Sequence, residues 1–224
     1  MKTAVQATTS SAISFALIML AMFWPAGTFD YWQAWVFLGV FVVLAVIYTV
    51  YMGVTNPAAL RRRMNAGPLH ETRPVQKVVS AGVGLTFFAL LVAAGFDHRF
   101  DWSTVPPPLV FVGNVLVVIG LGIAMLVVVQ NSYAAANITV EADQPVVSTG
   151  LYGLVRHPMY FGSLIMMVGT SLALGSYWGL VMVAVMAMLF AIRIVDEEKA
   201  LTDGLSGYRE YTRKVQSRLV PHVW

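Results

Sequence analysis

Apolar residues in this chain gather into six segments separated by polar stretches. A membrane-spanning helix needs roughly 20 apolar residues, with about 17 as the lower limit, and most of the segments approach or exceed that length. Inside a bilayer the backbone polar groups must be satisfied internally, so segments of this length favour helices over strands. The predicted spans are Ser11–Ala26, Trp32–Val54, Val78–Phe96, Leu109–Val129, Met159–Gly175 and Tyr177–Val195.

The connections refine this picture. The last two segments meet at Gly175-Ser176, which predicts a tight helical hairpin. The first ends in Trp24-Pro25 without a small-residue cleavage site, so we expect a retained span rather than a signal peptide. A short surface helix is expected around Ala58–Asn65 in the long basic loop after the second span.

The tail after the last span is charged but carries apolar residues at spacings of three and four. Such spacing places side chains on one face of a helix. We therefore expect a C-terminal amphipathic helix that lies at the membrane interface. The apolar residues concerned are Leu201, Leu205, Tyr208, Tyr211 and Val215.

Composition and charge agree with a polytopic all-α membrane protein. The 224 residues are 58% hydrophobic and 11% charged, whereas soluble domains carry roughly 25% charged residues. With an N-in/C-in topology, every Lys and Arg except Arg99 falls on the inner side, as the positive-inside rule requires. Because the basic residues sort by side, the net charge of +3 does not indicate a nucleic-acid partner. The absence of Cys excludes disulfides, thiolate metal sites and a Cys nucleophile.

Arg156 and His157 stand directly before Pro158, a residue favoured at the first turn of a helix. The free N–H groups of a helix N-terminus suit a carboxylate or another anion. These residues and Tyr160 therefore have two interpretations. They are either part of a binding site or an ordinary boundary charge, a capping residue and an interfacial aromatic.

Arg193 and Glu197 are four residues apart and share a helix face near the inner end of the sixth span. They are either functional or an ion pair that holds down the helix end. Glu198 and Asp196 point about 100° to either side of Glu197 and are expected to be solvated.

Other polar features also have alternative interpretations. Asn131-Ser132-Tyr133 and Asn137 form either a polar wall for a ligand or a helix exit and turn. The triplet Arg61–Arg63 is expected to anchor to anionic lipid headgroups, and the alternative is a role in binding a lipid-headgroup substrate. Two Gly-x-Gly pairs, at Gly82 and Gly120, do not continue to a nucleotide fingerprint and are expected to be helix-packing glycines. No paired-His metal motif occurs, so we expect no metal site.

The C-terminal part resembles a known family. The segments Val147-Ser-Thr-Gly-Leu-Tyr152, Val155-Arg-His-Pro-Met-Tyr-Phe-Gly162 and Glu197-Glu-Lys-Ala-Leu201, with Gly207-Tyr208, Tyr211 and Arg218-Leu-Val-Pro221, are similar to the isoprenylcysteine carboxyl methyltransferase family. The likeness is closest to its bacterial branch, which is related to phospholipid N-methyltransferases, and covers roughly residues 131–224. Intramembrane sterol reductases share an Arg-His-Pro-x-Tyr-like element.

The resemblance implies an integral membrane methyltransferase that uses S-adenosyl-L-methionine at the cytosolic face. Matching the family's motifs implies catalytic roles for Arg193, toward the methyl acceptor, and for Glu197. It also implies that cofactor contacts come from Asn137, Gln144, Pro145, Val146, Val147, Tyr152, His157, Pro158, Met159, Tyr160 and Glu197.

These expectations describe one integral membrane domain, in which residues 1–130 are scaffold spans and 131–224 the cofactor-binding and catalytic half. The resemblance implies a lipophilic acceptor, namely an isoprenylcysteine-like carboxylate or a lipid amine, and the bacterial inner membrane as the location. Two other functions stay open, an NADPH-dependent sterol-type reductase and a non-enzymatic transporter or scaffold.

Overall fold

The computed structural model of the protein describes residues 2–64, 71, 73–134 and 144–224, and helices are the regular structure throughout these ranges, with no strand among them. The side chains of residues 2–11 and of Met64 lie outside the description. In chain order the elements are α1 (Lys2–Ala26), α2 (Trp32–Thr55), α3 (Pro57–Met64), α4 (Pro74–Phe100), α5 (Pro107–Gln130), the 3-10 turn η2 (Gly150–Gly153), α6 (Pro158–Ala173), α7 (Gly179–Gly204) and α8 (Tyr208–Lys214).

Each of the six apolar segments coincides with one of the helices α1, α2, α4, α5, α6 and α7, and α3 coincides with the expected surface helix. By length and composition α2, α4, α5 and α7 are four helices that could cross a membrane. The helix α6 has 16 residues and therefore spans about 24 Å, less than the roughly 30 Å of a hydrocarbon core. The described apolar part of α1, Ala12–Ala26, is similarly short.

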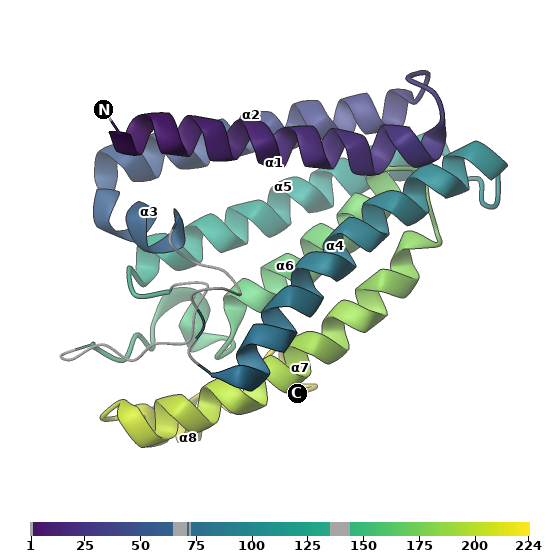
Figure 1. Cartoon of the computed structure of the whole chain (residues 1–224). Coiled ribbons are helices and arrows are strands. Elements are labelled where there is room, and N and C mark those ends of the chain that lie inside the picture. The colour runs from purple at the N-terminus through teal and green to yellow at the C-terminus, as the bar shows by residue number, and fades with distance from the viewer. Residues whose placement is uncertain (1, 65–70, 72, 135–143) are drawn as a thin grey trace.

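The helix ends and short turns divide between the two ends of the bundle (Figure 1). At one end lie the α1–α2 turn, the α4–α5 turn and residues 174–178 between α6 and α7. At the other end lie α3, α8 and the start of α6. The charge asymmetry of the sequence thus corresponds to the two ends of the structure, because Arg61–Arg63 lie in α3 whereas Arg99 lies in the last turn of α4. The orientation of these ends relative to a membrane stays a prediction.

Glycines bring α5 and α6 into backbone contact. A Cβ added at Gly113 would lie 2.3 Å from the Ala173 nitrogen, and one at Gly120 would lie 2.5 Å from the Gly162 oxygen. Small residues permit this close approach between helices in a membrane. The packing role expected for Gly120 is therefore consistent with the structure, whereas a Cβ at the nearby Gly122 would have no atom within 4 Å.

The C-terminal tail differs from the expected interfacial helix. Helix α7 continues to Gly204, the chain turns at Gly207 with a positive φ of 83°, and α8 begins one residue later. The apolar side chains of the tail pack together with Val146 and Tyr152. The prediction of one continuous amphipathic helix was wrong because the chain turns at Gly207, whereas the location of the tail at a membrane interface stays a prediction.

Candidate functional site

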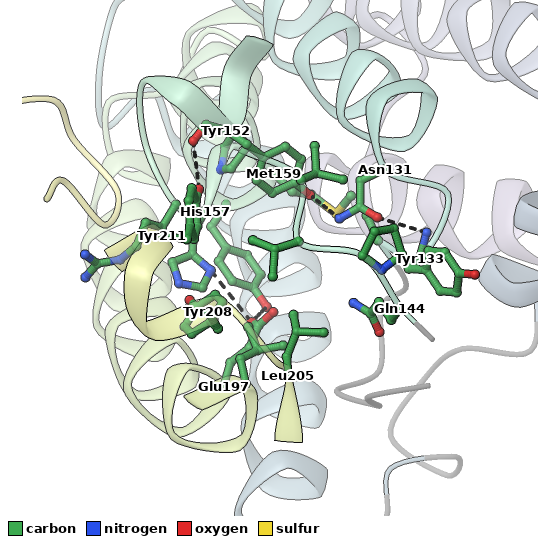
Figure 2. A pocket seen from close by; sticks show the side chains of 18 residues that line it. Asn131, Tyr133, Gln144, Tyr152, His157, Met159, Glu197, Leu205, Tyr208 and Tyr211 are labelled. Carbon is green, nitrogen blue, oxygen red and sulfur yellow. Dashed lines mark hydrogen bonds and ion pairs between the residues drawn. The ribbon is translucent and has the colours of Figure 1, made fainter. Parts of the chain in front are cut away.

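A polar-walled pocket lies at the end of the bundle where α5 ends, α6 begins and α7 extends beyond the core (Figure 2). Three stretches of chain form it, from the exit of α5, from the segment leading into α6, and from the last turns of α7 with α8. We call it the polar pocket. It is lined by Asn131, Tyr133, Ala134, Gln144, Pro145, Val146, Val147, Tyr152, Arg156, His157, Pro158, Met159, Tyr160, Glu197, Leu201, Leu205, Tyr208 and Tyr211.

The start of α6 is held by the C-terminal segment. Pro158 occupies the first turn of α6, and His157 precedes it as the N-cap residue without a side-chain capping bond. The backbone N–H groups of Arg156 and His157 donate to the carbonyl oxygens of Ser217 and Arg218 at 3.0 and 2.9 Å. These bonds hold the entry to α6 in place and keep the buried His157 side chain beside Glu197 and Glu198.

Tyr160 links the pocket to a buried network. Its hydroxyl donates to Glu197 Oε2 at 2.6 Å and accepts from Arg193 Nε at 2.9 Å. Its ring stacks on Phe190 at 4.8 Å and on His157 at 5.6 Å between centroids. Since the hydroxyl is held from both sides and the ring is packed, Tyr160 orients the Glu197 carboxylate at the pocket wall.

Behind Tyr160, Arg193 is buried and paired. Arg193 Nη2 lies 3.0 Å from Glu71 Oε1, and both residues are at most 5% exposed. Arg193 Nη1 donates to Gln76 Oε1 at 3.0 Å and to Ser80 Oγ at 2.6 Å. A cation at this depth requires such partners, because an Arg inside a membrane helix costs about 2.5–3.5 kcal/mol by insertion scales.

Glu198 is the centre of a second ionic cluster. Its Oε1 lies 2.6 Å from Arg156 Nε and 3.3 Å from His157 Nε2, and its Oε2 lies 2.9 Å from Arg218 Nε. Its side chain is 12% exposed, so the expectation that Glu198 is solvated was wrong. The cluster ties α7, the start of α6 and the C-terminal segment together.

Asp196 was also expected to be solvated, and the structure shows it engaged. Its Oδ1 lies 2.7 Å from Arg73 Nη2, and its Oδ2 accepts from Gln76 Nε2 at 2.6 Å. Gln76 thus connects Asp196 to Arg193, since its amide oxygen accepts from the guanidinium. The sequence could not reveal these pairs because the partners are more than 100 residues apart along the chain.

Tyr152, Tyr208 and Tyr211 lie together on one side of the polar pocket (Figure 2). Tyr211 donates its hydroxyl to the Tyr152 carbonyl at 2.7 Å, and Asn131 Nδ2 donates to the Tyr152 hydroxyl at 3.2 Å. Burial raises the pKa of Tyr152 to about 12, although the Asn131 hydrogen bond and the charge of Arg63 act in the opposite direction. Tyr152 is therefore a neutral hydroxyl at physiological pH.

Tyr208 is the unsatisfied member of this wall. Its hydroxyl oxygen is buried and has no hydrogen-bond partner within the described part of the chain. Burial, with the charges of Glu198 and Glu197, raises the pKa of Tyr208 well above its usual value. The hydroxyl thus keeps its proton and is available as a donor to a group in the polar pocket.

The structure brings together most residues that the sequence singled out. Arg193 does not line the polar pocket and reaches it through Tyr160, and Asn137 lies outside the described residues. Asn131 and Tyr133 line the pocket, which favours the polar-wall interpretation for these two. The functional roles of all these residues stay predictions. The predicted residues that line the pocket are Gln144, Pro145, Val146, Val147, Tyr152, His157, Pro158, Met159, Tyr160 and Glu197.

Sequence reasoning missed Glu71 and the place of Tyr208 at the pocket. Glu71 is the one acidic residue in the basic stretch between Asn56 and Gln76, and this isolated carboxylate was the available signal. Tyr208 was assigned to an amphipathic face, which hid its position beside Glu197 and His157 in the pocket wall.

The fold and the pocket define a helical protein with several helices that could cross a membrane and a polar pocket at one end of its bundle. Residues 109–207 match the model of the phospholipid methyltransferase family. This segment is thus similar to that family, which is related to the isoprenylcysteine carboxyl methyltransferases. The match begins with α5, earlier than the resemblance indicated, and ends just before Tyr208. A comparison with curated proteins found no match. The family match and the apolar helices together indicate a membrane methyltransferase.

Proposed function

We propose that the protein is an integral membrane methyltransferase that uses S-adenosyl-L-methionine to methylate a lipophilic acceptor. One observation carries the proposal. The polar pocket, with Glu197 held by Tyr160 on one wall, is built mainly from residues inside the segment that matches the phospholipid methyltransferase family.

The residues of the polar pocket fit S-adenosyl-L-methionine. When bound, this cofactor supplies a methyl group on a positively charged sulfur. The Glu197 carboxylate suits a cationic group, and the Tyr208 hydroxyl, which has no partner among the described residues, suits an acceptor atom of a ligand. Val146, Leu201 and Leu205 provide an apolar surface for a flat ring.

The protein's own contribution is mainly binding and orientation, since holding reactants in a productive geometry can supply much of a rate enhancement. Arg193 acts in this proposal as a positioning residue, because its charge is neutralised by Glu71 and it contacts the hydroxyl of Tyr160. Glu197 is the catalytic candidate that faces the polar pocket.

The acceptor is either a carboxylate of an isoprenylcysteine-like compound or a lipid amine. A carboxylate needs no base, whereas an ammonium acceptor must first lose a proton. Of the two adjacent carboxylates, Glu197 is the candidate base. Glu198 is engaged by Arg156 and Arg218 and does not line the polar pocket.

The proposal includes six membrane spans, both termini inside, and a polar pocket that opens to the cytosol at a bacterial inner membrane. Residues 1–130 would act as scaffold and 131–224 as the cofactor-binding and catalytic half. The gathering of α3, α8 and the pocket at one end of the bundle supports this placement (Figure 1). Basic residues in α3 would face anionic headgroups on that side.

Two other functions make different predictions. A sterol-type reductase would bind NADPH and not S-adenosylhomocysteine. A transporter or scaffold would bind neither, and changes at Glu197 would then alter stability alone. The matched methyltransferase family favours the first proposal over both.

Calorimetric binding of S-adenosylhomocysteine to the purified full chain in detergent tests the proposal. We expect micromolar binding by the wild type and binding weaker by about 10- to 100-fold in Glu197→Ala and His157→Ala, because a hydrogen bond to a charged group contributes about 1.5–3 kcal/mol. Glu210→Ala, on an exposed carboxylate of α8, is the matched control and should bind as the wild type does.

Thermal unfolding of each variant separates lost binding from lost folding, and Glu197→Gln provides a variant of the same shape. A folded wild type that binds NADPH and no S-adenosylhomocysteine would refute the proposal in favour of the reductase. If S-adenosylhomocysteine binds, a labelled-methyl screen of lipid amines and prenylated carboxylates identifies the acceptor.

A further inference from the structure

A second hollow lies between α2 and α5, and we call it the α2–α5 groove. Apolar side chains of both helices line it, among them Phe41, Leu44, Leu121 and Met125. It runs from the middle of the two helices to the end of the bundle that carries α3. If α2 and α5 span the membrane as proposed, this apolar groove faces the hydrocarbon chains of lipids.

Two polar groups, the Arg63 guanidinium and the Tyr48 hydroxyl, lie at the end of the groove. Arg63 of α3 lines it and makes no ion pair with any carboxylate in the described ranges. The hydroxyl of Tyr48 is buried and neither donates nor accepts a hydrogen bond within the described ranges. A half-buried guanidinium and a buried hydroxyl in such a place together suit an anion.

Arg63 also lies at the boundary with the polar pocket. Its Nη1 is 3.5 Å from Met159 Sδ and 3.4 Å from the Ala134 carbonyl, and Met159 and Ala134 line the pocket. The charge of Arg63 acts as well on Tyr152 across the pocket, where it lowers the pKa against the effect of burial. The groove and the pocket therefore adjoin at Arg63.

We propose that the α2–α5 groove binds the hydrocarbon chain of the methyl acceptor and that Arg63 and Tyr48 bind an anionic head group next to it. This assignment rests on the proposed function, since it adds an acceptor site beside the cofactor site. Both acceptor classes carry a suitable anion. A phospholipid amine is joined to a phosphate, and an isoprenylcysteine carries a carboxylate.

Photocrosslinking of lipids to the full chain in detergent tests the assignment. The probes carry a diazirine near the end of the chain and are phosphatidylethanolamine, an S-farnesylcysteine and uncharged diacylglycerol. We expect one of the two probes that carry an anionic group to label residues 41–48 or 121–125 in preference to diacylglycerol. The identity of that probe distinguishes the phosphate from the carboxylate source. Equal labelling by all three probes would overturn the role of the anion.

Two pairs of variants test the two ends of the groove. Arg63→Gln should weaken binding of the labelled probe by at least about tenfold, whereas Arg61→Gln, the same charge change on an exposed neighbour, should have little effect. Gly122→Leu should block the groove without a clash, because a Cβ there would have no atom within 4 Å. Gly84→Leu on α4, where a Cβ is equally unobstructed, is its matched control.

S-adenosylhomocysteine binding is measured on the same samples and is expected to be unchanged in Gly122→Leu. If the cofactor analogue binds but Gly122→Leu and Arg63→Gln leave lipid labelling unchanged, the groove assignment is refuted and the proposed function stands. If the wild type binds lipid in the groove but no S-adenosylhomocysteine, the proposed function fails while the lipid site remains.

Discussion

The buried pair of Arg193 and Glu71 leads to a prediction whose size follows from the structure. We consider Arg193→Met, which keeps an unbranched side chain and removes the charge. The variant leaves Glu71, 3% exposed, without the cation that lies 3.0 Å from its carboxylate. It also removes the hydrogen bonds that Arg193 donates to Gln76, Ser80 and Tyr160. Breaking a buried pair in this way costs about 3–5 kcal/mol, because an uncompensated buried charge remains.

For a chain of this size 1 kcal/mol corresponds to about 2–4 °C in Tm, so we expect a decrease of roughly 6–20 °C. The assay is thermal unfolding of the detergent-purified protein, followed by the fluorescence of its six Trp residues. The double variant Glu71→Gln with Arg193→Met should recover part of the loss, because no buried charge is left, and the cycle of variants should show a coupling energy of about 1 kcal/mol or more.

The matched control is Arg213→Met, which removes an exposed Arg of α8 and should change Tm by little. Unfolding of Arg193→Met at the same temperature as this control would contradict a stabilising buried pair, and so would a further loss of stability by the full separate effect of Glu71→Gln in the double variant. A folded Arg193→Met that binds S-adenosylhomocysteine as the wild type does would also exclude the positioning role of Arg193 through Tyr160.

Three further predictions concern other parts of the molecule. Gly113→Ala should destabilise the protein by about 1–3 kcal/mol in a thermal unfolding assay, because its Cβ would lie 2.3 Å from a backbone nitrogen of α6. The control Gly122→Ala should be neutral or slightly stabilising. Tyr208→Phe should keep the wild-type Tm, because the hydroxyl has no partner among described residues, but should bind S-adenosylhomocysteine about two- to tenfold more weakly in calorimetry. Glu198→Gln should loosen the C-terminal segment by breaking its ionic cluster, and hydrogen exchange of the Arg156 and His157 amides should accelerate by about tenfold or more; unchanged exchange would contradict this structural role.

The sequence alone was sufficient to place the helices. Each apolar segment corresponds to a helix whose bounds differ from the prediction by a few residues where the polar flanks are clear, as at α2 and α5. The larger differences occur at α1, which begins nine residues earlier at Lys2, and at α7, which continues to Gly204. Hydrophobicity identifies the part of a helix that needs an apolar environment but does not show how far the helix continues beyond it.

Motif resemblance in the sequence also identified most of the residues that line the polar pocket, including His157, Tyr160 and Glu197. These residues lie in two short stretches, and their order along the chain is enough to recognise a family. It does not reveal what supports them. Three features became apparent only in the folded chain. They are the Arg193–Glu71 pair, the three side-chain partners of Glu198, and the Tyr208 hydroxyl, which has no partner among the described residues.

The tertiary structure decided these features because they depend on contacts between distant parts of the chain. Arg193 and Glu71 are 122 residues apart, and they meet because α4 and α7 pack side by side. Arg63 reaches Met159 across 96 residues in the same way, which joins the α2–α5 groove to the polar pocket. Local sequence determines helices through hydrophobicity and length, whereas the pairing of buried charges depends on the packing that brings the helices together.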